Sequence, residues 1–340
     1  MGNEHSSRKV HPVSSMSSVS RRGDMYAPKP HKINDNFKTL KEVSDHIRKE
    51  GLESSNLIFG IDFTSSNLEQ GQKTNDGYSL HQFFEKKLNQ YQLVMKIMCD
   101  TLSSFDEDQK IPVFGFGDLH TKDHSVFPMH DEKGWAYGID GVLETYNKTV
   151  LRFGGGELKM SGPTSFVPII NKAIEIVKET GQYHILIIVG DGMVVDKDES
   201  ASAIVEASNY PLSIVMIGVG DGPWSSMEKF DNDLPKRRFD NFQLVVVSKY
   251  LTDNKYNLVD EFPSALFARD ALMEIPEQFN KIKELGLLGK VKRSVLQQPA
   301  FNPQYEQVYP ILYNPSAPKA PYHDCPPGGA CIHDNPLNSV

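Results

Sequence analysis

The chain is poor in cysteine, in long apolar runs and in positive charge. Its 340 residues include three cysteines, too few for a disulfide framework, and this favours a reducing, cytoplasmic location. No apolar run approaches the ~20 residues that a membrane-spanning helix needs, and no secretory signal follows Met1. The net charge of −8 argues against a nucleic-acid partner. The composition instead suits a globular protein with polar extensions.

Both ends of the chain differ in composition from its middle. Residues 1–35 contain serine, histidine and proline without apolar periodicity, and residues 295–340 contain nine prolines. Segments of this kind bury too little apolar surface to fold alone. We therefore predict a disordered N-terminal segment (1–35), one domain (36–290) and a proline-rich disordered tail (291–340).

The first residues contain the pattern of a lipidation signal. Gly2 follows Met1, and Ser6 stands where the N-myristoylation pattern requires serine or threonine. Residues 1–35 hold six Lys/Arg against three acids, and a basic segment supplies the second signal that one acyl chain needs for anchoring. We predict acylation of Gly2 and a peripheral position on the cytoplasmic face of the plasma membrane or an endomembrane. The alternative is a disordered start that happens to begin Met-Gly.

Strand-like and helical patterns alternate through the middle of the chain. Five runs rich in Val, Ile and Leu have no polar face, at 57–63, 111–117, 183–190, 212–219 and 242–248. Helical patterns occupy 37–52, 79–105, 138–150, 162–181, 199–210, 223–232 and 263–288. Strands that are apolar on both faces belong in a parallel sheet covered by helices on both sides. The predicted fold class is therefore α/β, with a doubly wound, mostly parallel sheet.

Oxygen-bearing side chains follow two of these strands. In LIFGIDFTSSN, Asp62, Thr64 and Ser66 stand at alternate positions after the first strand. Asp191 follows the third strand, and Thr164 opens the helix before it. The carboxyl ends of parallel strands share one edge of a sheet, where ligands bind. Hydroxyl and carboxylate oxygens suit Mg²⁺ or Mn²⁺ rather than zinc, so we predict a metal site at these five residues.

Each of these features also has an ordinary structural explanation. Asp-x-Thr-x-Ser can form a turn or cap a helix, and Asp-Gly commonly makes a turn. Their combination at the ends of the expected strands favours the metal site. Uncharged hydroxyl ligands leave positive charge on the ion, which can then accept a carboxylate from another molecule. Because no nucleophile or base stands beside the motif, the site is predicted to bind rather than to catalyse.

Longer stretches of the sequence resemble the von Willebrand factor A domain of copine proteins. Asp62-x-Thr64-x-Ser66 matches the first loop of that fold's metal-ion-dependent adhesion site (MIDAS), with threonine at 64 where many members have serine. Thr164 in SGPTSF and Asp191 in VGDG match the second and third loops. The copine character is carried by LESSNLIFGIDFTSSN, IPVFGFGD, GPTSFVPII, YPLSIVMIGVGDGPW, FDNFQLV and ALMEIPEQF followed by LGLL.

The resemblance implies a protein-binding module. It implies that Ser66 and the hydroxyl of Thr64 coordinate the metal directly. It also implies that Thr164 and the two acids coordinate it directly or through water, and that an acidic residue of a partner protein takes the sixth position. The predicted function is a divalent-metal-dependent adaptor or scaffold without enzymatic activity.

The alternative is a role linked to ubiquitin ligases. The N-terminus resembles a plant branch of copine-like proteins that carry a zinc-binding RING with ligase activity. We expect no RING here, because its two zinc ions need four ligands each and the tail offers only Cys325, Cys331, His323 and His333. The two calcium- and lipid-binding domains that precede the A domain of copines are not expected either.

The tail also contains the sequence PSAP at Pro315–Pro318. It resembles short peptides that membrane-sorting complexes bind, and proline-rich segments fit grooves that recognise the polyproline II conformation. We therefore regard it as a candidate binding segment for a partner protein.

Replacing Gly2 by alanine removes the acceptor for an N-terminal myristoyl group. In cells, the parent chain should sediment largely with membranes, and Gly2→Ala should move largely to the soluble fraction, because the basic segment alone binds membranes weakly. Fractionation by ultracentrifugation measures this. An unchanged distribution would contradict acylation at Gly2.

Overall fold

The computed structural model describes residues 38–129, 135–192, 194–225, 227–228, 234, 237–251 and 262–289. In this part of the chain a six-stranded sheet has the order β4-β3-β1-β6-β7-β8, in which β4 is antiparallel to β3 and the other neighbours are parallel. Its strands are β1 (Asn56–Asp62), β3 (Val113–Phe116), β4 (Phe127–Pro128), β6 (His184–Gly190), β7 (Leu212–Gly218) and β8 (Phe242–Val246). An antiparallel pair joins β2 (Lys110–Ile111) and β5 (Ala136–Tyr137). The predicted mostly parallel α/β fold is confirmed.

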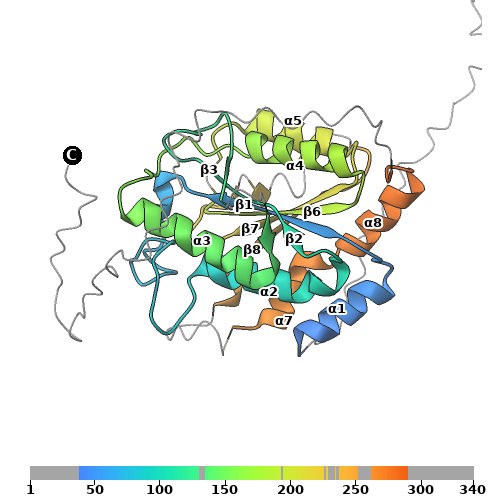
Figure 1. Ribbon diagram of the computed structural model, residues 1–340, viewed down its shortest axis with the longest axis horizontal. Coiled ribbons are helices and arrows are strands. Elements are labelled where there is room, and N and C mark those ends of the chain that lie inside the picture. Colours follow the sequence, from blue (N-terminus) through green and yellow to red (C-terminus); the bar gives the residue numbers. More distant parts are fainter. Residues whose placement is uncertain are drawn as a thin grey trace, which may run out of the picture. The chain divides into compact units, whose positions relative to one another are not determined.

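Helices cover both faces of the sheet (Figure 1). One face carries α4 (Val167–Thr180) and α5 (Lys197–Ala207). The other carries α1 (Leu40–Lys49), α2 (Gln90–Leu102), α3 (Gly138–Gly154), α7 (Ser264–Leu272) and α8 (Ile275–Glu284). Short 3₁₀ turns form η1 (Ser65–Leu68), η2 (Ser103–Phe105) and η3 (Val247–Tyr250). Successive side chains of β6 alternate between the two cores, which explains why the strand reads as a continuous apolar run.

The strand order reverses beside β1. The chain passes from β1 to β3 on one side and later enters β6 on the other side. In open α/β sheets, a crevice forms outside the carboxyl ends of the strands at such a reversal. Asp62 is the last residue of β1, and Asp191 directly follows β6. The topology therefore places both predicted acidic ligands at the same edge of the sheet.

Gly60, within β1, lets α4 approach the sheet closely. A Cβ at this position would lie 2.5 Å from Cγ1 of Ile169, a fully buried residue of α4. A packed interior has no room for the extra methyl group without a shift of its neighbours. Gly60 thus helps to set the position of the helix that follows the Thr164 loop.

The predicted helix over 79–105 is wrong in its first part. Helix α2 begins at Gln90, and residues 79–89 are not helical. The side-chain oxygen of Asn89 accepts the N–H of Gln92 at 2.9 Å, and Oε1 of Gln92 accepts the N–H of Asn89 at 2.9 Å. This reciprocal capping box fixes the start of the helix. The apolar spacing at Phe84 and Leu88 continues the pattern upstream without continuing the helix.

The five predicted strands correspond to β1, β2 with β3, β6, β7 and β8, with small shifts at their ends. Strands β4 and β5 were not predicted, because two residues are too few for any alternation to be read. The helix predicted over 263–288 is divided into α7 and α8, and Pro276 lies in the first turn of α8.

Several predictions fall outside the described residues. They concern the N-terminal segment with Gly2, and the tail with Pro315–Pro318 and its cysteines and histidines. The domain limits at 35/36 and 290/291 therefore stay predictions. Among the residues that the structure describes, no helix is long and apolar enough to cross a membrane.

Candidate metal centre

Three chain segments that carry the predicted ligands meet at the carboxyl edge of β1 and β6. After β1, Thr64 forms a β-bridge with Ser161, and Ser65 donates its N–H to the carbonyl of Ser161. Three residues further on, the carbonyl of Thr164 accepts the N–H of Val195 at 3.2 Å. The segment after β1 is thereby joined to the segment before α4, which is joined in turn to the segment after β6.

Asp62 is the most constrained of the predicted ligands. Its side chain is fully buried, and Oδ1 accepts the N–H of Thr64 at 2.8 Å. Burial first, and then the negative charge of Asp191, raise the pKa of Asp62 to about 7, although hydrogen bonds from Thr64 and from the backbone of Asp191 oppose this. Oδ2 is buried and has no hydrogen-bond partner among the described residues. Such an oxygen is costly to bury unless another group satisfies it.

Two glycines leave room for the side chains at this edge. A Cβ at Gly190 would lie 2.9 Å from Oδ2 of Asp62, so the carboxylate lies directly over that glycine. Gly117, with a φ of +83°, faces Thr64, and a Cβ there would lie 2.3 Å from Cγ2 of Thr64. Neither position accepts a larger residue without moving a predicted ligand.

The hydroxyl groups of Thr64 and Ser66 form a pair at the surface of the site. Their Oγ atoms are 3.0 Å apart; Thr64 is buried and Ser66 is partly exposed. Asn67, fully buried, donates to the carbonyl of Thr64 at 3.2 Å and to its Oγ1 at 3.3 Å. Oδ1 of Asn67 accepts the hydroxyl of Tyr91 at 2.6 Å. Asn67 therefore holds the loop that carries both hydroxyls.

Thr164 reaches the site through the segment that precedes α4, and its side chain is buried. The next residue, Ser165, donates its hydroxyl to Oδ2 of Asp196, and Oδ1 of Asp196 accepts the hydroxyl of Ser200 at 2.9 Å. These bonds tie the Thr164 loop to the start of α5. Two of the predicted ligand loops are thus held together by side chains as well as by the backbone.

His81 supports β1 from beneath the site. Its ring stacks between Phe63 and Tyr91, with ring centroids 4.6 and 4.2 Å away. Nε2 is 2.9 Å from the carbonyl of Asp62, and Nδ1 is 2.8 Å from the hydroxyl of Tyr146. Burial lowers the pKa of His81 to about 3, so the ring is neutral. Because a carbonyl only accepts, Nε2 carries the proton and Tyr146 donates to Nδ1, which leaves neither nitrogen available as a base.

The carboxyl edge of β1 and β6 offers oxygen donors of the kind that hard divalent cations prefer. Within the described part of the chain, no group of three or more His, Cys, Asp and Glu side chains could hold a metal. The candidate site instead combines two carboxylates with hydroxyl groups, a donor set that suits Mg²⁺ or Mn²⁺. A cation there would satisfy Oδ2 of Asp62 and relieve its repulsion with Asp191. The structure brings the five predicted residues to one edge, and their role as ligands stays a prediction.

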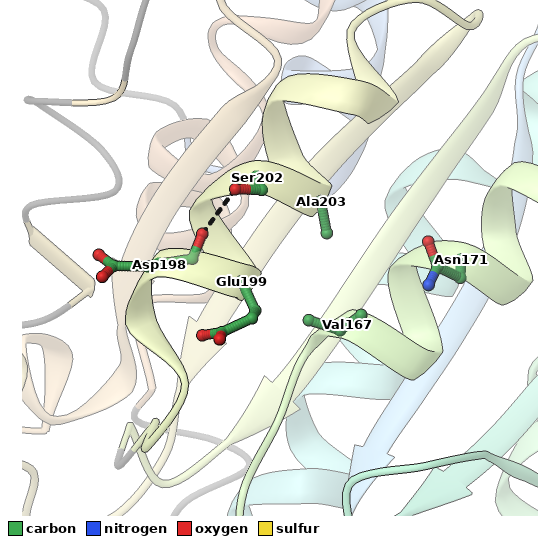
Figure 2. A pocket seen from close by; sticks show the side chains of 6 residues that line it. All are labelled: Val167, Asn171, Asp198, Glu199, Ser202 and Ala203. Atoms are coloured by element: carbon green, nitrogen blue, oxygen red, sulfur yellow. Dashed lines mark hydrogen bonds between the residues drawn. The ribbon is translucent and has the colours of Figure 1, made fainter.

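A pocket of about 390 Å³ lies between α4 and α5 (Figure 2). It is lined by Val167, Asn171, Asp198, Glu199, Ser202 and Ala203. Asp198 and Glu199 belong to the first turn of α5, where acidic side chains interact favourably with the helix dipole. This structural role accounts for both acids, and we assign no ligand to the pocket.

The fold and the site together define a class of protein. Its members have a mostly parallel α/β sheet with hydroxyl and carboxylate side chains at the carboxyl edge. The family model described as Copine matches residues 79–291, more than half of the chain. The chain belongs to the copine family.

Similar proteins differ greatly in how much of their own length this chain covers. Copine family protein 2 of Caenorhabditis elegans is 48% identical over 267 residues, which are 78% of this chain and 3% of that protein. E3 ubiquitin-protein ligase RGLG4 of Arabidopsis thaliana is 41% identical over 306 residues, 84% of this chain and 74% of that protein. Among solved structures, the manganese-loaded TRAP protein of Plasmodium vivax is 11% identical, with a TM-score of 0.37 over 58% of this chain and 70% of that one.

Asn67→Ala should destabilise the domain, because it leaves the buried carbonyl of Thr64 without that donor and the hydroxyl of Tyr91 without that acceptor. We expect a loss of about 1–3 kcal/mol in the free energy of unfolding, measured by urea denaturation. Asn209→Ala is the control: Asn209 is exposed, and within the described part of the chain it bonds only to Glu206. A loss no larger at Asn67 than at Asn209 would contradict the supporting role of Asn67.

Proposed function

We propose that this copine-family chain is a protein-binding adaptor whose binding requires Mg²⁺ or Mn²⁺. One observation carries the proposal. Oδ2 of Asp62 is buried without a hydrogen-bond partner among the described residues, and it lies beside a second buried acid, Asp191, where the hydroxyls of Thr64 and Ser66 meet. A divalent cation would satisfy this oxygen and offset both negative charges.

In this proposal, Ser66 and Thr64 hold the cation through their hydroxyl groups. Thr164 and the two acids contribute directly or through water. The bound cation supplies an open coordination position that a carboxylate of a partner protein can fill. The chain's own residues keep the donors in place: Gly190 leaves space for the carboxylate of Asp62, and Asn67 fixes the loop of Thr64.

The surroundings of the site favour binding over catalysis. His81 lies next to Asp62, but it is neutral and both of its nitrogens are engaged. Tyr91 and Tyr146 are buried, and burial raises the pKa of both hydroxyls, so neither is ionised near neutral pH. We therefore propose no reaction at this edge.

We further propose that the adaptor works at the cytoplasmic face of membranes. The support is the Met-Gly start with Ser6 and the six basic residues of 1–35. These residues lie outside the described part of the chain, so this step rests on the sequence alone.

Contribution to protein ubiquitination, as a substrate-binding component, is the second candidate. It is favoured by the relative named E3 ubiquitin-protein ligase RGLG4, which is 41% identical across 84% of this chain. An autoubiquitination assay with purified E1, E2, ubiquitin and this chain tests whether the chain is itself a ligase. The adaptor proposal expects no ubiquitin conjugates from this chain alone, because residues 295–340 offer only Cys325, Cys331, His323 and His333 where a RING uses eight zinc ligands. Conjugates formed by this chain alone would overturn the adaptor proposal.

Magnesium should stabilise the folded chain through Asp62. We expect millimolar MgCl₂ at about tenfold excess over Kd to raise the melting temperature by about 3–6 °C, and we expect Asp62→Asn to abolish the rise. Asp198→Asn, which changes an exposed acid of α5, should respond like the parent. Differential scanning fluorimetry in MgCl₂ and in EDTA measures the effect. An equal rise in Asp62→Asn and in the parent would refute the placement of the cation.

A further inference from the structure

The loop after β7 contacts two of the chain segments that carry predicted metal ligands. It comprises residues 219–224, and we call it the β7 loop. Its first N–H, that of Val219, donates to the carbonyl of Gly190 at 2.9 Å, at the end of β6. None of the five predicted ligands belongs to this loop. Its contacts therefore decide what it contributes to the site.

Asp221 ties the β7 loop to the segment that follows Ser66. The carbonyl of Ser66 accepts the N–H of Gln70 at 3.0 Å, and the carbonyl of Gln70 accepts the N–H of Asp221 at 2.9 Å. The carboxylate of Asp221 accepts the N–H of Lys73 at 3.0 Å. It also accepts the N–H and the hydroxyl of Thr74, at 3.0 and 2.8 Å. A continuous set of hydrogen bonds thus runs from Ser66 to the β7 loop.

Gln90 strengthens the same junction from the first turn of α2. Its side chain is fully buried, Oε1 accepts the N–H of Gly220 at 2.9 Å, and Nε2 donates to the carbonyl of Thr74 at 2.9 Å. A Cβ at Gly220 would lie 2.6 Å from the carbonyl oxygen of Gln70, so a larger residue there would push the two segments apart. The β7 loop is therefore fixed closely against the segment after Ser66.

Trp224, the last residue of the β7 loop, packs against the loop of Asp191. Gly192 directly follows Asp191, and a Cβ at Gly192 would overlap Cζ3 and Cε3 of the indole. A Cβ at Gly218 would lie 2.5 Å from Cζ3, and one at Gly222 would lie 2.8 Å from Nε1. Three glycines thus leave the space that the indole fills. The ring lies against the backbone next to a predicted ligand.

This packing restricts the backbone beside Asp191. Gly192 has a φ of +90°, and glycine has more backbone conformations available to it than any other residue. The side chain of Trp224 is partly exposed and packs against the core on the side of α4 and α5, and its carbonyl accepts the N–H of Glu228 at 2.9 Å. An indole held in this way limits the conformations of Gly192. It therefore holds Asp191 in place before a cation binds.

We propose that Trp224 is a positioning residue of the metal centre. Its indole fixes the loop that carries Asp191, and the β7 loop, through Asp221, ties that loop to the segment after Ser66. A cation then binds to donors that are already ordered, and a shift of Asp191 on binding is transmitted through Gly192 to the indole. This inference rests on the proposed function and adds a residue that acts on the cation only through another.

Metal affinity tests the positioning role. The Kd for Mn²⁺ is measured on the full chain by electron paramagnetic resonance, from the loss of the signal of free Mn²⁺, below the unfolding transition of each variant. Trp224→Ala should raise this Kd about tenfold, because the freed backbone of Gly192 must be ordered when the cation binds. Trp224→Phe should bind Mn²⁺ nearly as the parent does, because a phenyl ring still covers Gly192.

Ile47→Ala is the control for a general loss of stability. Ile47 is buried in α1, which precedes the amino end of β1, the end opposite the predicted ligands. Its truncation should lower the melting temperature and leave the Kd for Mn²⁺ unchanged. If Trp224→Ala binds Mn²⁺ as tightly as the parent, or if Ile47→Ala weakens binding equally, the positioning role is wrong.

Tryptophan fluorescence tests the link with the indole in place, so it does not depend on the folding of Trp224→Ala. The chain has two tryptophans, and Trp135 precedes β5, which pairs with β2 before the start of β3, away from the carboxyl edge. In Trp135→Phe the emission comes from Trp224 alone, and MgCl₂ should change it saturably. EDTA should reverse the change, and Asp62→Asn in the same background should abolish it. Trp224→Phe, which keeps only Trp135, should show no change.

The results distinguish this inference from the function beneath it. If the parent binds no Mn²⁺, or if Asp62→Asn binds it as tightly as the parent does, the proposed function fails first. If the parent binds Mn²⁺ through Asp62 but MgCl₂ leaves the emission of Trp135→Phe unchanged, the metal site stands and the role of Trp224 is wrong. An equal change in the emission of Trp224→Phe would overturn that role as well.

Discussion

The candidate metal site at the carboxyl edge of β1 and β6 depends on two carboxylates, those of Asp62 and Asp191, that are buried next to each other. Asp62 and Asp191 are both inaccessible to solvent, and burial together with the charge of Asp191 raises the pKa of Asp62 to about 7. Two like charges held in a low-dielectric interior repel each other unless a cation or a proton intervenes. The surrounding structure retains the pair by leaving space at Gly190 and by directing the N–H of Thr64 at Oδ1.

The same edge joins chain segments that are distant in sequence. Backbone hydrogen bonds link the residues after β1 to those before α4, and those before α4 to the loop after β6. The loops that carry the candidate metal ligands therefore lie together at one edge of the sheet.

Most of the fold, and the edge of the sheet that carries the candidate site, could be predicted from the sequence. The same physical reasons explain which predictions were wrong. Apolar runs without a polar face reveal strands buried on both sides, and the polar residues that end them mark the carboxyl edge. The start of α2 was misread because Phe84 and Leu88 continue its apolar spacing, although Asn89 and Gln92 carry a readable capping pattern. The closeness of Gly117 to Thr64, and of His81 to the carbonyl of Asp62, could not be read, because both arise from packing between distant segments.

The stacked His81 ring affects how tightly a ligand could bind at the end of β1. The imidazole stacks between two aromatic rings and is hydrogen-bonded at both nitrogens. The end of β1 therefore has little conformational freedom. A receptor that is already ordered forfeits little conformational entropy on association, so more of the contact energy remains as affinity. In this protein, a neutral histidine that bonds the carbonyl of Asp62 orders the strand end that carries the candidate ligands.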